Sequence, residues 1–310
     1  MTWNPTALPS ASGKTFVVTG ANAGLGYFTA EQLARTGAQV VLACRNPVRA
    51  DAALAAIRRR VPGAVVSTVA LDVSDLASVN SAATALQQLP RIDGLILNAG
   101  IVHPPRNREQ SVDGHELVFA TNFLGHFALT AALLPQLGAT QGSRVIALGS
   151  MITRLMDSRL DDVQLERAYN PWTAYAQSKI AAQVFGFELD RRLRAAGQGG
   201  AAGVQALVAH PGYSISGLTP SIRGVNQPNR AKRFVDNLQA PITQGKDRGA
   251  WPIVRAVLDP GASGGEYYGP RFVTKGIPTR QQPTRTSLDR EVASRLFARS
   301  EEFAGVDFPV

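Results

Sequence analysis

The sequence predicts an α/β protein in which a doubly wound parallel sheet of about seven strands carries helices on both faces. Strand-length apolar segments alternate with helix-length segments over roughly the first two-thirds of the 310 residues. Several of these strands are continuous apolar runs, which indicates burial on both faces of a parallel sheet. Strands alternating with helices of this length are typical of a Rossmann-type arrangement. No repeat or low-complexity linker interrupts the pattern, so we expect one domain over residues 1–310.

The first half of the chain supplies four strand–helix pairs. Strands are expected over Thr15–Thr19, Gln39–Ala43, Val65–Leu71 and Gly94–Asn98. The helices that follow them are expected over 24–35, 47–60, 75–88 and 113–137. Asn46 is a suitable N-cap with Pro47 at the first helical position, and Ser74 is expected to cap the helix that begins at Asp75.

The second half continues this pattern and then changes character. Strands are expected over 143–149 and 204–209, with a helix over 173–196 between them. The segment 211–246 is rich in Gly, Pro, Asn and Ser, and within it residues 213–246 are expected to form a substrate lid. Further helices are expected over 247–258 and 286–304, with a short strand at 266–268.

Composition excludes several classes of protein. Hydrophobic residues make up 45% and charged residues 18% of the chain, as in globular proteins. No apolar run reaches the ~20 residues of a membrane span, and the N-terminal segment lacks the basic and apolar regions of a secretory signal. A single cysteine, Cys44, excludes an internal disulfide and is typical of a reducing compartment, so we expect a cytoplasmic protein.

The charged and metal-binding residue types are scattered. The net charge is +9, yet the basic residues form no stripe with interleaved aromatic residues, so we expect no nucleic-acid partner. The histidines His103, His115, His126 and His210 include no i, i+4 pair, so no metal site is predicted. We interpret His126 as a packed helix residue.

The first expected strand ends in a glycine-rich turn, Thr19-Gly-Ala-Asn-Ala-Gly-Leu-Gly26. Glycines between a buried strand and a helix let the backbone approach a pyrophosphate, and the helix directs its N–H groups toward it. The spacing is G-x-x-x-G-x-G instead of the usual G-x-G-x-x-G. We therefore predict a dinucleotide site, with contacts from Gly20, Asn22, Gly24, Leu25 and Gly26.

The second expected strand is followed by Cys44 and Arg45. Folds of this kind that bind NAD usually place an acidic residue here to accept hydrogen bonds from the ribose hydroxyls. An arginine suits a 2′-phosphate instead, through its charge and its fork geometry. We therefore expect NADP(H) to be preferred and leave NAD(H) open, because Arg45 could also be a solvated arginine at a strand end.

Tyr175 and Lys179 are the most informative pair in the chain. Their i, i+4 spacing places an ammonium beside a phenol on one face of the expected helix. The pKa of a phenol lies near ~10. For a tyrosine to serve as a general acid or base near neutrality, this pKa must fall by roughly 3 units, which corresponds to about 4 kcal/mol. A fixed neighbouring cation can lower the pKa of the phenol. Taken alone, the pair is more simply explained as a surface tyrosine and a surface lysine.

With these motifs, the chain resembles the short-chain dehydrogenase/reductase family. The motifs occur in the family's order and continue through Leu71-Asp72-Val73, Asn98-Ala99-Gly100, Asn122, Ser150 and Pro211-Gly212. The resemblance is closest to the retinol-dehydrogenase-like branch. That similarity rests on residues 43–45, 113–116, 122–127 and 267–270.

The resemblance implies an oxidoreductase that interconverts a carbonyl and an alcohol on an apolar substrate. Tyr175 would transfer the proton, and Lys179 would lower the pKa of Tyr175 and bind the nicotinamide ribose. Ser150 would hold the substrate oxygen, and Asn122 would position a water that links Lys179 to solvent. The remaining cofactor contacts would come from Asp72, Val73, Asn98, Ala99, Gly100, Pro211, Gly212 and Ser216.

Two departures from the family pattern affect this assignment. The interval between Ser150 and Tyr175 is about twice the commonest spacing, but the longer segment 151–170 also occurs in the retinol-dehydrogenase-like branch. Ser216 stands where the family commonly has threonine and keeps the hydroxyl. We expect Met151, Trp172 and Tyr213 to border the substrate pocket, with ordinary packing as the alternative.

Two other functions stay open at this point. A non-catalytic NADPH-binding sensor or partner protein would not need the complete set of proton-relay residues. An epimerase or dehydratase would usually carry a larger separate substrate domain than the segment after His210. The family often forms homodimers or homotetramers through its long helices, although segment 151–170 could cover that surface.

Overall fold

The structure, a computed structural model, describes residues 3–310 and contains a central sheet of eight strands in the order β10-β9-β6-β5-β4-β1-β2-β3. Neighbouring strands pair in parallel, except for β10, which runs antiparallel to β9. The strands are β1 Thr15–Thr19, β2 Gln39–Cys44, β3 Val66–Ala70, β4 Gly94–Leu97, β5 Arg144–Leu148, β6 Gln205–Ala209, β9 Tyr267–Pro270 and β10 Pro278–Arg280. The doubly wound prediction is confirmed, and β10 adds a strand that the sequence did not reveal.

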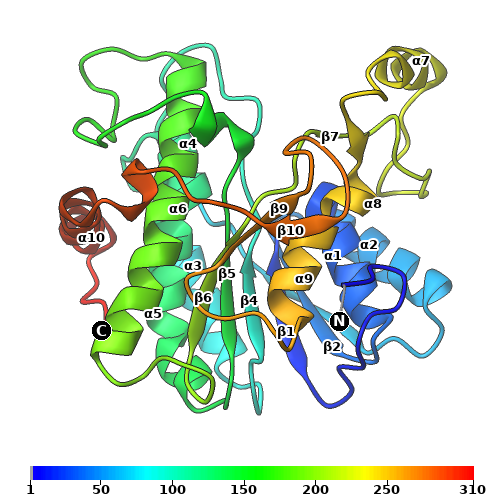
Figure 1. Cartoon of the computed structure of the whole chain (residues 1–310), viewed down its shortest axis with the longest axis horizontal. Helices are drawn as coiled ribbons and strands as arrows, with labels where there is room; N and C mark the ends of the chain where they lie inside the picture. The colour runs from blue at the N-terminus through cyan, green and yellow to red at the C-terminus, as the bar shows by residue number, and fades with distance from the viewer. Residues whose placement is uncertain (1–2) are drawn as a thin grey trace.

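Helices cover both faces of this sheet (Figure 1). One face carries α1 Gly24–Ala34, α2 Pro47–Arg60 and α9 Trp251–Leu258, whose apolar side chains share one buried core. The other face carries α3 Leu76–Leu86, α5 Gly125–Gly138 and α6 Pro171–Ala195, which form a second core. Strand order reverses between β1 and β4, and ligands of doubly wound folds bind at such a switch point, beyond the carboxyl ends of the strands.

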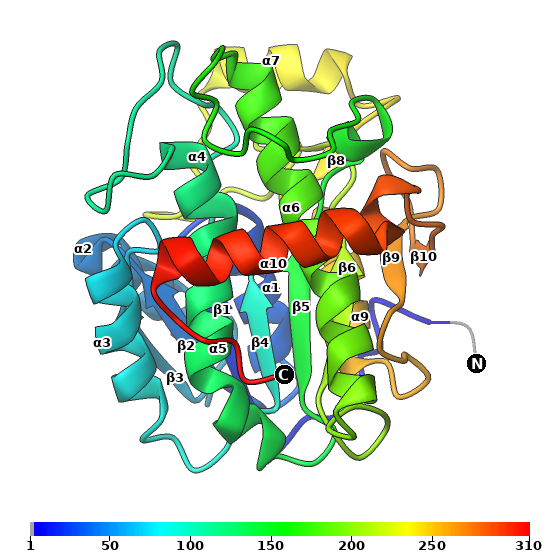
Figure 2. The ribbon, with the colours of Figure 1, turned by 90° about the vertical axis from the view of Figure 1, so that its left-hand side faces the viewer.

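A further helix, α10 Arg290–Ala304, lies across α5 and α6 (Figure 2). Phe297 of this helix packs between Phe127 of α5 and Phe185 of α6, with ring centroids 5.4 Å and 5.7 Å away. Phe308 in the C-terminal segment closes the same cluster, 4.8 Å from Phe127. Four buried aromatic rings therefore fix the C-terminal part of the chain to the central helices.

The expected N-caps are right at one helix and wrong at another. The Asn46 side chain accepts a hydrogen bond from the Arg49 amide at the start of α2, as predicted. At α3 the cap is Asp75, whose carboxylate accepts from Ala77 and Ser78, and the helix begins one residue later than expected. Ser74 cannot serve because its hydroxyl and amide both donate to Asp72.

The long helix expected over 113–137 begins later and is interrupted. Its first turn is α4 Leu117–Phe119, capped by the buried carboxylate of Glu116, and a π-helical turn over Ala120–Leu124 precedes α5. Gly114 has a φ of +85°, which an α-helix excludes, and Asp113 instead accepts from the Leu76 amide of α3. The continuous stretch Leu117–Gly138 is long and apolar enough to span a bilayer, but 83% of its most apolar window is buried in the fold, as in a core helix.

The segment expected to be a lid is closed at its base. Strand β7, Ser214–Ile215, pairs in parallel with β8, Gln244–Gly245, and the segment between them includes α7 Arg230–Leu238. The short helix α8, Lys246–Gly249, follows β8 directly. Helix α7 stands above the carboxyl edge of the sheet (Figure 2).

The segment 151–170 packs against the rest of the fold at several points. It begins with the 3-10 helix η2, Met151–Arg154, and its side chains Leu160, Val163 and Leu165 are buried. A second 3-10 helix, η3 Thr286–Leu288, leads into α10, whose Arg295 donates to Asp161. The segment that follows Ser150 in sequence therefore also contributes side chains to the core.

A buried arginine joins the sheet to α9. Arg144, the first residue of β5, donates to the carbonyl oxygens of Ala256, Val257 and Asp259 at 2.9–3.1 Å and to Ala262 at 3.1 Å. Burial lowers the pKa of its guanidinium. These carbonyls lie at and beyond the end of α9, where no helical N–H reaches them.

We expect Arg144→Leu to lower the free energy of unfolding by roughly 2–4 kcal/mol, because it leaves several buried carbonyls without a donor. Urea unfolding followed by circular dichroism measures the change. The matched control is Arg59→Leu, which removes an exposed arginine from α2. If the two variants lose equal stability, Arg144 does not anchor α9 in this way.

Candidate active site

The predicted catalytic residues meet at the carboxyl edge of the sheet. Ser150 follows β5, and Tyr175 lies in the first turns of α6, which begins at Pro171 after the Asn170 cap. The Tyr175 hydroxyl donates to Ser150 Oγ at 3.3 Å. Ser150 Oγ also accepts from the Ile152 amide and so caps η2, which means that this serine has both a structural contact and a contact with Tyr175.

Lys179 lies one turn beyond Tyr175 and is buried. Its Nζ donates to the Leu148 carbonyl of β5 at 3.2 Å. A side chain at Gly100 would place its Cβ 3.8 Å from Nζ, so the loop after β4 also borders the ammonium. Burial lowers the pKa of Lys179 from 10.5 to about 8.

The structure differs from the expected electrostatics of Tyr175. Burial raises the pKa of this phenol above 10.0, and the hydrogen bond with Ser150 only partly opposes the increase. We expected Lys179 to lower this pKa, but its ammonium faces the Leu148 carbonyl, and the low polarity around Tyr175 has the larger effect.

Asn122 holds the site together through its side-chain amide. Its Oδ1 accepts from the Ile101 amide at 2.6 Å, and its Nδ2 donates to the Ile101 carbonyl and to Ser178 Oγ. These bonds tie the π-helical turn to the loop after β4 and to α6. The role of Asn122 in positioning a water stays a prediction.

Thr19 and His126 form a contact that the sequence did not reveal. The Thr19 hydroxyl oxygen accepts from the Asn98 and Ala99 amides and lies 2.9 Å from His126 Nε2. The other ring nitrogen of His126 lies 3.4 Å from the Asn122 carbonyl. Burial lowers the pKa of His126 to about 3, so its ring is neutral. His126 is thus a packed helix residue, as interpreted, and its ring also joins β1 to the turn that carries Asn122.

The glycine turn has the shape that a dinucleotide phosphate requires. Gly20 and Gly24 have positive φ of +65° and +59°, and a Cβ at Gly26 would lie 2.4 Å from Asn98 Nδ2. Asn98 donates in turn to the Thr19 carbonyl. Helix α1 has no side-chain cap and no acidic residue in its first turn, which leaves its N–H groups available to an anion. The turn, including the partly exposed Asn22 and Leu25, therefore fits the predicted cofactor.

Arg45 and Asp72 lie side by side beyond β2 and β3. Arg45 Nη1 is 3.5 Å from Asp72 Oδ2, and the arginine side chain is 74% exposed. An ion pair this exposed contributes little to stability, so the guanidinium is accessible to a ligand at this edge. Val73 follows in the same loop, and its carbonyl would lie 1.8 Å from a Cβ on Gly125, which brings α5 against the loop.

The loop after β6 is fixed by short-range bonds. Gly212 has a φ of +66° and donates to His210 Nδ1. The Pro211 carbonyl accepts from the side chains of Ser214 and Gln244, which ties this loop to the base of the lid segment. Ser216 is half-buried in the same region, and its contact with a carboxamide stays a prediction.

The residues expected to bind substrate lie around this edge. Met151 follows Ser150 directly and is half-buried. Trp172, in the first turn of α6, is 67% exposed, and Tyr213 is 41% exposed with its hydroxyl bonded to Gln239 of the lid segment. Their role in substrate binding stays a prediction.

Gln183 is a supporting residue that sequence analysis missed. It lies one turn beyond Lys179 on the same face of α6, and its Nε2 donates to Thr153 Oγ1 and Tyr267 Oη and lies 3.4 Å from the Ser150 carbonyl oxygen. It thereby fixes the turn that carries Ser150. The i, i+4 continuation from Tyr175 through Lys179 to a buried glutamine was the signal that could have revealed it.

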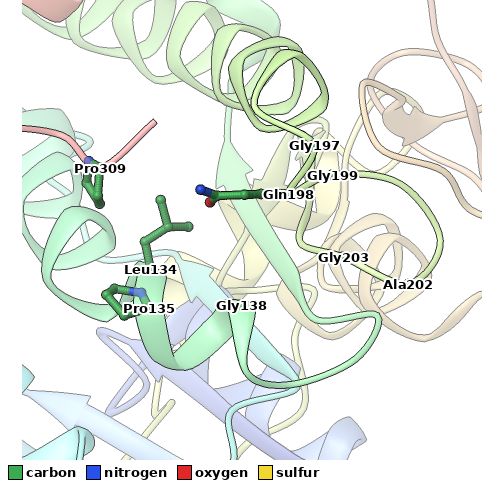
Figure 3. A pocket seen from close by; sticks show the side chains of 9 residues that line it. All are labelled: Leu134, Pro135, Gly138, Gly197, Gln198, Gly199, Ala202, Gly203 and Pro309. Atoms are coloured by element: carbon green, nitrogen blue, oxygen red, sulfur yellow. The ribbon is translucent and has the colours of Figure 1, made fainter.

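The larger of the two cavities described lies away from this site. It measures about 600 Å³ and is lined at the end of α5, in the loop before β6 and near the C-terminus (Figure 3). The end of α5 leads into β5, and the loop after α6 leads into β6. The cavity therefore lies at the amino ends of these two strands, opposite the edge that carries Ser150 and Tyr175. Over residues 3–310, no group of three or more His, Cys, Asp or Glu side chains is arranged to hold a metal ion.

The sheet, the glycine turn and the Ser150–Tyr175–Lys179 group together define a dinucleotide-dependent oxidoreductase. Residues 14–224 match the family described as short chain dehydrogenase, and the chain belongs to this short-chain dehydrogenase/reductase family. The family binds NAD(P)(H) and acts on CH–OH groups.

Named relatives agree with this assignment. The chain is 43% identical to human dehydrogenase/reductase SDR family member 13, over 95% of this chain and 74% of the relative. It is 35% identical to human retinol dehydrogenase 13, over 96% and 86% of the two chains. A crystal structure of a putative uncharacterized protein from Mycobacterium Paratuberculosis superposes with a TM-score of 0.79 at 36% identity, covering 99% of both chains. The resemblance to the retinol-dehydrogenase-like branch is therefore confirmed.

The buried ammonium of Lys179 makes stability depend on pH. Since its pKa falls from 10.5 to about 8 on folding, the folded state bears the full cost of the charge below pH 8. That cost declines as the pH rises toward 10.5, because the folded state loses the proton first. We expect Lys179→Met to be more stable than the parent at pH 7, with an advantage that shrinks between pH 8 and 10.5.

Urea unfolding at a series of pH values measures this difference. Lys14→Met, which removes an exposed lysine, is the control and should show no such trend. A difference between Lys179→Met and the parent that stays constant over the window would show that the buried charge does not titrate as described.

Proposed function

We propose that this oxidoreductase uses NADP(H) to interconvert a carbonyl and a primary or secondary alcohol on an apolar substrate, with Tyr175 as the acid and base. The observation that carries the proposal is the 3.3 Å contact between Tyr175 Oη and Ser150 Oγ, with buried Lys179 one turn away. A tyrosine, a serine and a lysine in this arrangement can hold a substrate oxygen and move a proton to or from it.

The residues divide the chemistry as follows. The nicotinamide of a bound cofactor supplies or accepts the hydride. Ser150 Oγ donates a hydrogen bond to the substrate oxygen, and Tyr175 delivers the proton to that oxygen in reduction or removes it in oxidation. Lys179 would contact the nicotinamide ribose of the bound cofactor through its ammonium. Its fixed bond to the Leu148 carbonyl keeps the ammonium on this side of α6.

The cofactor preference rests on Arg45. Arg45, and not an acidic residue, stands directly after β2. Its exposed guanidinium can contact a 2′-phosphate in the bidentate geometry that arginine favours. Asp72 partly balances the charge of Arg45, which also leaves NAD(H) usable. Accordingly, we propose that NADP(H) is preferred and that NAD(H) is accepted more weakly.

The alternative of a non-catalytic NADPH-binding protein gains no support from the site. A binding protein would not need a half-buried phenol bonded to a serine beside a buried lysine, since burying these groups costs stability. Epimerisation or dehydration is disfavoured because the segment after His210 forms short strands and helices that pack on the sheet, instead of a large substrate domain.

The substrate class follows from the edge of the site. Exposed aromatic surface on Trp172 and Tyr213 suits a fairly large apolar alcohol or carbonyl, which agrees with the retinol named for one relative. We propose residues 213–246 as the lid over this substrate. We also propose a cytoplasmic location, supported by the single cysteine, Cys44, which is buried and unpaired.

Tyr175→Phe should reduce turnover by roughly 10²–10⁴-fold, because it removes the acid and base but keeps the ring. NADPH consumption with a medium-chain aldehyde and an aryl ketone measures turnover, and fluorescence titration should show NADPH binding within about twofold of the parent. The control is Tyr169→Phe in the 151–170 segment, which removes a hydroxyl that donates to the Pro105 carbonyl. Parent-like turnover in Tyr175→Phe would refute the assignment.

Arg45→Asp should weaken NADPH binding by roughly 10-fold or more and narrow or reverse the preference over NADH, since it replaces the phosphate partner with a repelling charge. Calorimetric titration of both cofactors gives the two Kd values. Arg59→Asp makes the same charge change on the exposed part of α2 and should leave both values unchanged. Equal affinity of the parent for NADPH and NADH would contradict the preference.

A further inference from the structure

Lys246 places a cation beside the glycine turn. It is the first residue of α8 and ends the 213–246 lid segment. A Cβ built on Gly24 would lie 3.7 Å from Lys246 Nζ and 3.8 Å from its Cδ, so the lysine side chain runs along the turn between β1 and α1. Gly24 is the first residue of α1, where free helical N–H groups already favour an anion.

This ammonium has no anionic partner among residues 3–310. Its Nζ forms none of the ion pairs or hydrogen bonds found in that part of the chain. The neighbouring acid, Asp236, is already engaged by Lys232 at 3.2 Å and by the Gly217 amide at 2.7 Å. Burial lowers the pKa of Lys246, the charge of Lys232 lowers it further, and the charge of Asp236 only partly opposes this decrease. A half-buried cation that is repelled by a second cation gains from any anion that binds beside it.

The position of Lys246 is fixed from two sides. Its backbone amide donates to Thr219 Oγ1 of the lid segment at 2.8 Å. The next residue, Asp247, accepts from Gln32 of α1 at 2.8 Å, and Gly249 lies so close that a Cβ there would be 2.9 Å from Leu25 of the glycine turn. The lid segment therefore holds the backbone at Lys246, and helix α1 holds the residues that follow it.

We propose that Lys246 binds the pyrophosphate of the dinucleotide cofactor and so couples the lid segment to cofactor binding. This inference rests on the proposed cofactor site. The pyrophosphate is the relevant anion because Lys246 lies at the turn between β1 and α1, whereas Arg45 lies beyond β2 at the position suited to a 2′-phosphate. Lys246 should therefore contribute equally to the binding of NADPH and NADH, and Arg45 to NADPH alone.

Binding titrations with three probes test this division. NADPH carries both the pyrophosphate and the 2′-phosphate, NADH carries only the pyrophosphate, and 2′-AMP carries only the 2′-phosphate. In Lys246→Gln the Kd for NADPH and NADH should rise by the same factor, about 10-fold or more, as expected for one lost charge-assisted contact. The Kd for 2′-AMP should not change.

Two further variants complete the design. Arg45→Gln should show the opposite pattern, with weaker NADPH and 2′-AMP and unchanged NADH, and Lys246→Arg should keep near-parent affinity for all three. Thermal unfolding verifies that each variant is folded. Unchanged affinity for both dinucleotides in folded Lys246→Gln, or an equal loss for 2′-AMP, would overturn the proposal. A parent protein that binds neither dinucleotide would instead refute the proposed cofactor site itself.

Discussion

The arrangement of the whole site depends on one hydroxyl group. Thr19 ends β1, and its oxygen accepts the amides of Asn98 and Ala99 at the end of β4 while it contacts the ring of His126. These bonds hold together the two strands between which the strand order reverses. They set the separation between the glycine turn and the π-helical turn of Asn122, and therefore the distance between the phosphate end of the cofactor site and the proton-transfer residues. An apolar residue at this position would remove the acceptor of the Ala99 amide and one of the two acceptors of the Asn98 amide.

The same region accumulates electrostatic costs that packing elsewhere must offset. Burial disfavours the charged forms of Lys179, Tyr175 and His126, which lowers the pKa of the lysine and the histidine and raises the pKa of the tyrosine. Arg144 is also buried, yet its donors are matched by carbonyl oxygens at the end of α9. Arg144 therefore carries a charge that serves structure, whereas Lys179, Tyr175 and His126 have pKa values shifted by burial, and titratable groups of this kind gather where a protein performs chemistry.

Sequence reasoning succeeded where local patterns determine the structure. The buried strands were recognised as apolar runs, and the proximity of Tyr175 and Lys179 was predicted from their helical spacing. It failed where partners distant in sequence decide the outcome. The long helix begins at the Glu116 cap because Asp113 is engaged by α3, and β10 is too short and proline-containing to be recognised. Gln183 and Lys246 act through residues brought near by the fold, and the pKa of Tyr175 depends on burial that no spacing reveals.

Helix α10 has a consequence for how the protein holds together. The apolar faces of α5 and α6 are covered by Phe297 and Phe308 from the same chain. Apolar side chains of these two helices are therefore buried by a later segment of the same polypeptide. The C-terminal residues, far from the chemistry in sequence, are thus part of the smallest unit in which α6 can hold Tyr175 and Lys179 in place.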